Sequence, residues 1–92
     1  MRIDFDPAKS ARNERERGLP FSAAAGFAFE SAIVELDARR DYPEPRYVAV
    51  GFLGERLHVL CFTPLPDGLR VISFRKANAR EIKAHAQATS LD

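Results

Sequence analysis

Apolar residues alternate with polar ones in several short segments of the chain, and this period of two predicts β-strands. Residues 2–5, RIDF, alternate in this way and are typical of a short strand at a sheet edge. Residues 31–40 contain Ile33, Val34 and Leu36, and mostly charged residues follow. We therefore expect a second strand there.

Three β-rich runs follow in the second half of the chain. They are RYVAVGFL at 46–53, RLHVLCFT at 56–63 and GLRVISF at 68–74. Turn signals separate them, in GE at 54–55 and in PLPDG at 64–68. The pattern predicts an antiparallel meander, and the prolines of DYPEPR at 41–46 predict a loop before it.

Helix signals frame residues 7–17. Asp6 suits the N-cap, Pro7 the first helical position and Gly18 the C-terminal stop. Only Ala8 and Ala11 form an apolar face in this polar segment, so we expect the helix to make only a small apolar contact with the core.

Two more helices are predicted from the spacing of apolar residues. In residues 21–30, Phe21, Ala24 and Ala28 recur at helical intervals, which predicts a short second helix. Residues 77–88 are rich in alanine and predict a C-terminal helix. Its apolar stripe is weak, so we expect that a partner is needed to hold this helix down.

The elements follow the order β-α-α-β-β-β-β-α. We therefore expect a small single domain of the α+β class over residues 1–92. Its sheet would be mainly antiparallel with four to five strands, and the two N-terminal helices and the C-terminal helix would cover one face.

Composition agrees with a folded domain. Apolar residues make up 46% of the chain and charged residues 29%, without the low hydrophobicity of disordered proteins. The formal net charge of +1 argues neither for nor against nucleic acid, but its distribution is uneven. Residues 70–85 contain Arg70, Arg75, Lys76, Arg80 and Lys83 against Glu81 alone.

Arg75 and Lys76 lie where the last strand gives way to the last helix. The first backbone N–H groups of that helix, around residues 77–79, would add to an anion-binding end. The alternative is that the two cations are solvated and that one of them pairs with Glu81.

The sequence offers no metal or cofactor site and no membrane segment. His58 and His85 are far apart in the sequence, and no His/Asp/Glu cluster has ligand-like spacing, so we expect no metal or other cofactor. Cys61 is the only cysteine, which excludes an intramolecular disulfide and favours a reducing cytoplasm. The start of the chain lacks a secretory signal, and the longest uncharged stretch is shorter than the roughly 20 residues that span a bilayer.

The order of motifs resembles the BrnT family of toxins from bacterial type II toxin–antitoxin pairs. The motifs are FDPAK with a following asparagine and glycine, the pattern D.R.DY.E.R from residue 37, and RVIS.RKAN.RE from residue 70. The resemblance covers residues 4–83. It implies a fold similar to that of RelE toxins and an endoribonuclease that blocks translation. It also implies a BrnA-type ribbon-helix-helix antitoxin, through which alone operator DNA would be bound.

Such RNA cleavage needs a base, an acid and positive charge near the phosphate, and no metal is required. We expect Arg75, Lys76 and Arg46 to supply the charge, with Glu44 or His58 as the group that transfers the proton. Glu44 and Arg46 have an alternative as a loop salt bridge, and His58 as a strand residue that is partly buried or at the surface.

Other cations are candidates for RNA contacts. We expect Lys9 and Arg17 of the first helix and Arg80 of the last helix to contact the RNA backbone. The alternative for the first helix is an exposed surface whose charged side chains form salt bridges with one another. The phenylalanines and Cys61 are expected in the core.

The chain departs from the family pattern at the end of the first helix. It has Glu16 and Arg17 where the family commonly has lysine and histidine. The second hypothesis is therefore a protein-binding domain that keeps the toxin fold and the antitoxin interface but has lost catalysis. A third is a plain nucleic-acid-binding module, which the near-neutral charge disfavours.

Overall fold

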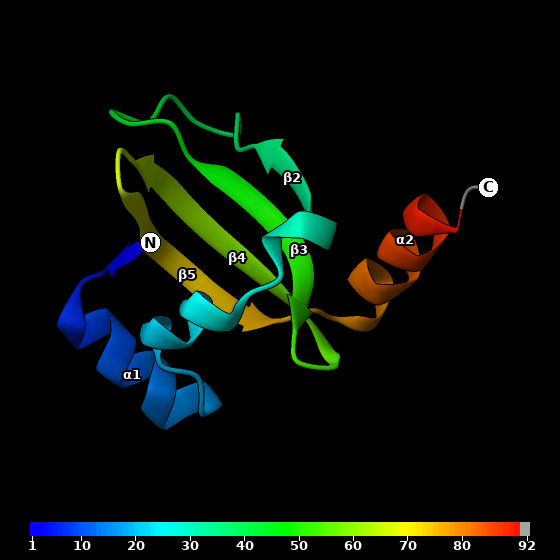
Figure 1. Cartoon of the computed structure of the whole chain (residues 1–92), viewed down its shortest axis with the longest axis horizontal. Coiled ribbons are helices and arrows are strands. Elements are labelled where there is room, and N and C mark those ends of the chain that lie inside the picture. The colour runs from blue at the N-terminus through cyan, green and yellow to red at the C-terminus, as the bar shows by residue number, and fades with distance from the viewer. Residues whose placement is uncertain (91–92) are drawn as a thin grey trace.

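A computed structural model describes residues 1–90, which form a five-stranded sheet with helices around it (Figure 1). The strands are β1 (Arg2–Asp4), β2 (Ile33–Leu36), β3 (Tyr47–Leu53), β4 (Arg56–Leu65) and β5 (Gly68–Lys76). Their order across the sheet is β1-β5-β4-β3-β2. Strands β2 to β5 pair antiparallel, which confirms the predicted meander, whereas β1 pairs parallel with β5 at one edge. The fold is a single α+β domain with a mostly antiparallel sheet, as expected.

The first helix, α1 (Pro7–Arg17), has the predicted caps. The Asp6 carboxylate accepts from the backbone N–H of Ala8, and Gly18 ends the helix in the left-handed region at φ 68°. The prediction for its buried face was wrong, because Ala8 and Ala11 are exposed. Instead Ser10 is buried, and its hydroxyl oxygen accepts from the Phe21 backbone N–H at 2.9 Å.

The helix predicted over residues 21–30 is confirmed only as helical turns and not as one continuous helix. Two short 3₁₀ helices, η1 (Phe21–Gly26) and η2 (Phe29–Ser31), stand in its place. Phe27 forms a β-bridge with Leu53, and the Ala28 backbone N–H donates to the Phe52 carbonyl at 2.9 Å. This segment thus joins the same edge of β3 that β2 extends. Pairing with the sheet overrides helix propensity there.

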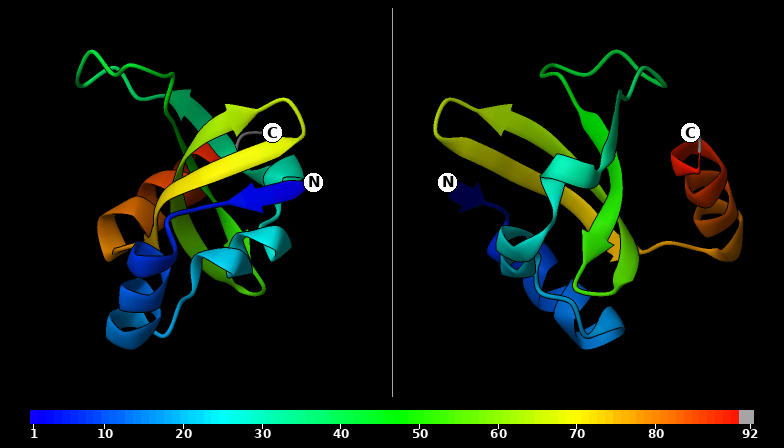
Figure 2. Two further views of the ribbon diagram at one scale, coloured as in Figure 1. Left: turned by 90° about the vertical axis from the view of Figure 1, so that its left-hand side faces the viewer. Right: turned by 45° about the vertical axis from the view of Figure 1, so that its right-hand side comes forward.

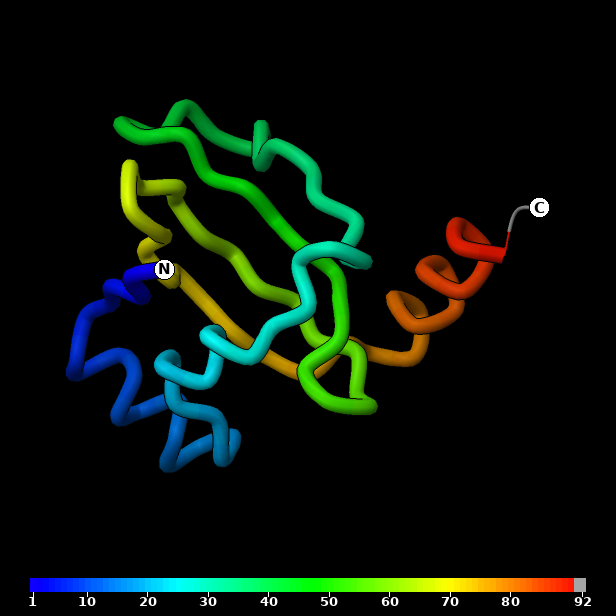
Figure 3. The backbone as a smooth tube through the Cα atoms, in the orientation of Figure 1, coloured from blue at the N-terminus to red at the C-terminus, as the bar shows by residue number. Residues whose placement is uncertain are grey.

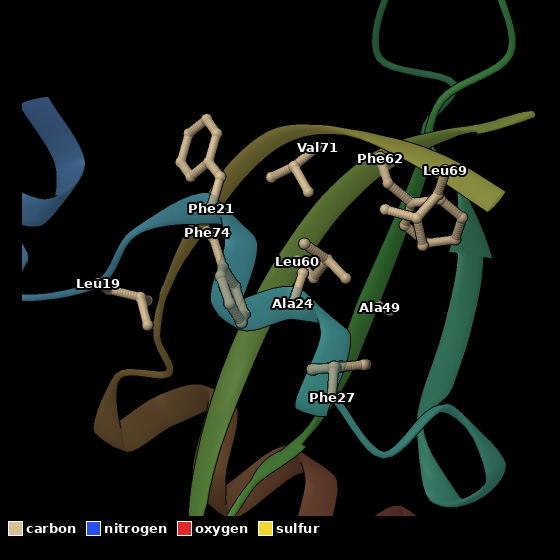
Figure 4. Close-up of a cluster of buried hydrophobic side chains, with 10 residues drawn as sticks. All are labelled: Leu19, Phe21, Ala24, Phe27, Ala49, Leu60, Phe62, Leu69, Val71 and Phe74. Carbon is tan, nitrogen blue, oxygen red and sulfur yellow. The ribbon is translucent and has the colours of Figure 1, made fainter. Parts of the chain in front are cut away.

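The main core lies between one face of the sheet and η1 (Figure 4). Its buried members are Leu19, Phe21, Ala24, Phe27, Ala49, Leu60, Phe62, Leu69, Val71 and Phe74. We call this the core face. The expectation that the phenylalanines are internal is confirmed for most of them, but Phe52 is 37% exposed. Cys61 is buried as expected, and burial raises the pKa of its thiol.

The last helix, α2 (Ala79–Thr89), begins and ends close to the prediction but lies on the other side of the sheet. Its neighbours Ala77, Leu57 and Val59 form a second apolar cluster with the half-buried Val48 and Val50. These side chains point away from Ala49 and Leu60, because successive strand residues face opposite ways. We call their side the second face. The prediction that all helices share one face was wrong.

Figure 2 shows α1 and α2 on opposite sides of the sheet. The tube of Figure 3 shows α2 projecting from the far end of β5, away from the N-terminus. Within residues 1–90, no helix is long and apolar enough to cross a membrane.

Candidate functional site

The two cations singled out in the sequence, Arg75 and Lys76, lie on opposite faces of the sheet. Lys76 is opposite His58 in the register of β4 and β5, and Arg75 is opposite Val59. Directly opposite residues of an antiparallel pair share a face, so Lys76 and His58 both lie on the core face. Arg75 lies on the second face with Val59. A single phosphate group on one face of the sheet therefore cannot contact both cations.

Arg75 is engaged within the chain. Its two terminal guanidinium nitrogens donate to the two carboxylate oxygens of Glu81, each at 2.8 Å. These hydrogen bonds lower the pKa of Glu81 to about 2. The pair matches the alternative in which one cation binds Glu81.

The start of α2 is occupied by its own side chains. Glu81 accepts from the Asn78 backbone N–H at 2.9 Å, and Asn78 accepts from the Glu81 backbone N–H at 2.8 Å. The Ala77 N–H donates to the Leu57 carbonyl at 2.9 Å. The expected anion-binding end is therefore filled by the Glu81 carboxylate, which is the anion that the helix terminus favours.

His58 lies on the core face at the end of the sheet where β4 begins. Its ring is 5.5 Å from that of Phe74, and only 4% of the residue is exposed. Nδ1 is 2.8 Å from the Arg56 carbonyl oxygen, so this nitrogen carries the proton that it donates there. In the neutral ring, Nε2 is then left with a lone pair.

Two further cations lie next to His58. Lys76 is exposed across from it on the same face. Arg56 is two positions before it at the start of β4, but its side chain extends to the α2 side, where it lines a hollow with Ile82 and His85. The sequence analysis did not single out Arg56, although its position two residues before His58 in the same strand places it close to that histidine. Its guanidinium reaches the Ala77 carbonyl oxygen at 3.4 Å.

Helix α1 ends beside this part of β5. The Asn13 side-chain amide donates to the Phe74 carbonyl at 2.9 Å and to the Leu19 carbonyl at 2.7 Å. Arg17 is one turn further along the same helix face, in the basic last turn. We call His58, Lys76 and Arg17 the His58 site.

The other candidate RNA-binding residues are more distant in the fold. Lys9 is exposed in the first turn of α1, about 12 Å from Arg17 along the helix axis. Arg80 is exposed in the first turn of α2, beyond the end of β5. The structure does not gather these two cations with the His58 site.

Glu44 and Arg46 lie at the opposite end of the sheet. Arg46 precedes Tyr47, which pairs with Phe62, and Phe62 is about 13 Å along β4 from His58. A single phosphate therefore cannot touch Arg46 and the His58 site together. The sequence alone did not reveal this separation, because it depends on the strand register.

Each of these two residues has its own neighbour. Glu44 accepts from Arg70 at 3.1 Å, rather than from Arg46. The Arg46 guanidinium stacks over the Tyr42 ring, with its carbon 4.2 Å from the ring centre. In the same loop, hydrogen bonds from Arg39 hold the pKa of Asp37 well below its usual range.

No group of three or more His, Cys, Asp and Glu side chains within residues 1–90 is placed to hold a metal ion. The His58 site consists of one imidazole and of cationic side chains, and no carboxylate belongs to it. This set can exchange a proton and can attract a phosphate.

Comparison with models of known protein families identifies a relationship that covers most of the chain. The model of a family described as the ribonuclease toxin, BrnT, of type II toxin–antitoxin systems matches residues 5–81. This range contains every candidate site residue from Lys9 to Arg80. Searches of curated proteins and of solved structures found no match.

Proposed function

The chain belongs to the BrnT family of ribonuclease toxins of type II toxin–antitoxin systems, and from this premise we propose that it cleaves RNA at the His58 site. The observation that carries the proposal is the pairing of His58 with Lys76 across β4 and β5. This pair joins an imidazole, which has a ring nitrogen able to accept a proton, to an exposed cation. Arg17 of α1 lies on the adjoining helix end.

The proton chemistry follows from the hydrogen bond of His58. Because Nδ1–H is held by the Arg56 carbonyl, Nε2 is the nitrogen that can accept a proton from a 2′-hydroxyl. The carbonyl also stabilises the imidazolium that forms. The 2′-oxygen then attacks the adjacent phosphorus, and the bond from phosphorus to the 5′-oxygen breaks. A 2′,3′-cyclic phosphate remains on the ribose that supplied the 2′-hydroxyl.

Positive charge stabilises the transition state of this step. We assign this charge to Lys76, which is opposite His58 in the register of β4 and β5, and to Arg17 in the last turn of α1. Lys76 is also a suitable donor for the leaving 5′-oxygen, because an ammonium group has three N–H donors. The scheme uses only groups of this chain and needs no metal ion.

The biological consequence of this cleavage is inhibition of translation, and a BrnA-type antitoxin neutralises it. The antitoxin carries a ribbon-helix-helix part, so operator DNA is bound through the antitoxin. Family membership implies an antitoxin and an RNA substrate, and it supports this more specific assignment.

A second function is favoured by two observations. His58 is 4% exposed, and Arg75 is bound by both carboxylate oxygens of Glu81. Together with Arg17 in place of the family's common histidine, they fit a domain that binds the antitoxin without cleaving RNA. When the chain is produced without an antitoxin, the first function predicts RNA cleavage and the second predicts none.

Expression of the chain alone in bacterial cells, followed by mapping of RNA 5′ ends, tests the proposal. We expect growth arrest and new 5′ ends, both absent for the variant His58→Gln. Growth without new 5′ ends for the unchanged chain would contradict cleavage and support the protein-binding alternative.

A further inference from the structure

Helix α2 and the second face of the sheet enclose an apolar groove. Its volume is about 260 Å³, and its apolar lining comes from Ile33, Val48, Val50, Ala84 and Ala88 together with His85. In the right-hand view of Figure 2, α2 stands beside the sheet rather than flat on it. We call this hollow the α2 groove.

The contact of α2 with the sheet leaves a polar atom unsatisfied. His85 is buried, with 9% of its surface exposed, and its ring meets the Phe52 ring edge-on at 5.6 Å. Within residues 1–90, His85 Nε2 is enclosed and has no hydrogen-bond partner. Buried polar groups are nearly always paired, so a segment bound beside His85 would gain by supplying the missing partner.

The charges around the groove indicate what kind of ligand it takes. Glu81 lines the groove and is paired with Arg75. Arg39 and Asp37, which line an adjoining hollow that shares Glu35 with the groove, are paired with each other. Glu35 also lines the groove; it is exposed and has no ion pair in the part of the chain that the structure describes. The groove thus combines apolar walls with one unpaired carboxylate.

This combination fits a protein segment and disfavours RNA. A phosphate chain would be repelled by Glu35 and would find no unpaired cation in the lining. An amphipathic protein segment would bury its apolar side chains between Val50 and Ala84 and place a basic side chain at Glu35.

We propose that the α2 groove is a binding site for an amphipathic segment of the antitoxin, with small apolar side chains on one side and a basic residue that pairs with Glu35. The proposal rests on the proposed function only in that the partner is an antitoxin. The groove is on the second face, whereas the His58 site is on the core face. Binding in the groove and cleavage of RNA are therefore separable by mutation.

The occupied groove also explains how α2 is held. The helix follows Lys76 after two residues and is fixed to β5 by the Arg75–Glu81 pair. A segment bound between α2 and the sheet adds contacts along the same face of the helix, which Glu81, Ala84 and Ala88 form, and supplies a hydrogen bond to His85. The bound antitoxin therefore orders α2 against the sheet.

The test is a titration calorimetry measurement with the purified cognate antitoxin as the titrant. Ala84→Gln places a polar amide in the groove, and Ala79→Gln makes the same change at an exposed position of α2 that does not line the groove. We expect Kd to rise at least about tenfold for Ala84→Gln and to stay within about twofold for Ala79→Gln. Both positions are exposed, so both variants fold.

A second pair of variants tests the charge. Glu35→Lys is expected to raise Kd about tenfold or more, while Glu30→Lys, an exposed glutamate in η2, leaves it within about twofold. RNA cleavage by the unbound variants is measured in parallel and should equal that of the unchanged chain.

Each outcome decides between the claims. Unchanged Kd for both Ala84→Gln and Glu35→Lys, or no binding of the antitoxin by the unchanged chain, overturns the groove proposal whatever the cleavage result. Loss of RNA binding by Ala84→Gln would show that the occupant is RNA. Absence of cleavage with groove-dependent binding would contradict the ribonuclease proposal and leave the groove assignment standing.

Discussion

At the scale of single residues, Arg75 and Lys76 are neighbours in sequence with different surroundings. Alternation along β5 sends Arg75 to the second face and Lys76 to the core face. The sequence showed that a basic cluster follows the strand. It did not show that Glu81 takes both terminal nitrogens of Arg75, because that contact depends on where α2 turns after the strand.

The Arg75–Glu81 pair predicts a pH-dependent loss of stability. Glu81→Gln should lower the free energy of unfolding by about 1 kcal/mol at pH 7, since the pair is partly exposed. The pKa of Glu81 is lowered from 4.5 to about 2 by folding, so its stabilisation is complete above pH 4.5 and is lost as the pH falls towards 2. The difference between the two proteins should therefore shrink over this range in urea unfolding.

Other acidic groups with lowered pKa values, such as Asp4 and Asp67, are present in both proteins and cancel in the difference. A gap that stays constant down to pH 2 would show that Glu81 acts through packing rather than through its charge.

Lys76 should contribute one phosphate contact to RNA binding. Lys76→Ala is expected to weaken binding of single-stranded RNA several-fold at low salt and to reduce the salt slope by about 0.7, the value for one phosphate contact. Lys83→Ala, an exposed lysine of α2, is the matched control and should change neither quantity much. An equal effect of the two substitutions would indicate only a diffuse electrostatic attraction.

At the scale of elements, local signals predicted some boundaries well and failed for others. The caps of α1 and the turns of the meander were correct because they depend on residues close in sequence. The helix predicted over residues 21–30 is interrupted because Phe27 pairs with Leu53, a contact that no local pattern shows. The attachment of α1 through Ser10 and Asn13 was missed for the same reason.

The close packing of this segment on β3 predicts a sensitive glycine. A Cβ at Gly51 would lie 2.8 Å from both Ala32 Cβ and Phe27 Cζ. Gly51→Ala should therefore lower the free energy of unfolding by about 1–3 kcal/mol, measured by urea denaturation. Gly26→Ala is the control, since its Cβ would meet only the Leu53 side chain at 3.4 Å and should cost less than about 1 kcal/mol. Equal stability of Gly51→Ala and the unchanged chain would argue against this packing.

At the scale of the whole molecule, the sheet separates residues that the sequence suggested as one site. The α+β class and the mostly antiparallel sheet were predicted because hydrophobic alternation and turns carry that information. The parallel pairing of β1 with β5 and the placement of α2 on the second face were not, since they depend on long-range packing. Register then places Arg46 and Glu44 at one end of the sheet and His58 and Lys76 at the other.

The two ends of the sheet make the central claim testable with one assay. The purified chain is incubated with 5′-labelled RNA in EDTA, and cleavage rates are compared for the unchanged chain, His58→Gln and Arg46→Ala. Thermal unfolding of each variant confirms that it is folded.

We predict cleavage by the unchanged chain in EDTA, with products that end in a cyclic phosphate. His58→Gln should reduce the rate about 100-fold or more, because the proton acceptor is lost, and Arg46→Ala should leave it within about threefold. An unchanged rate for folded His58→Gln, or loss of cleavage in Arg46→Ala alone, would contradict the assignment of the His58 site.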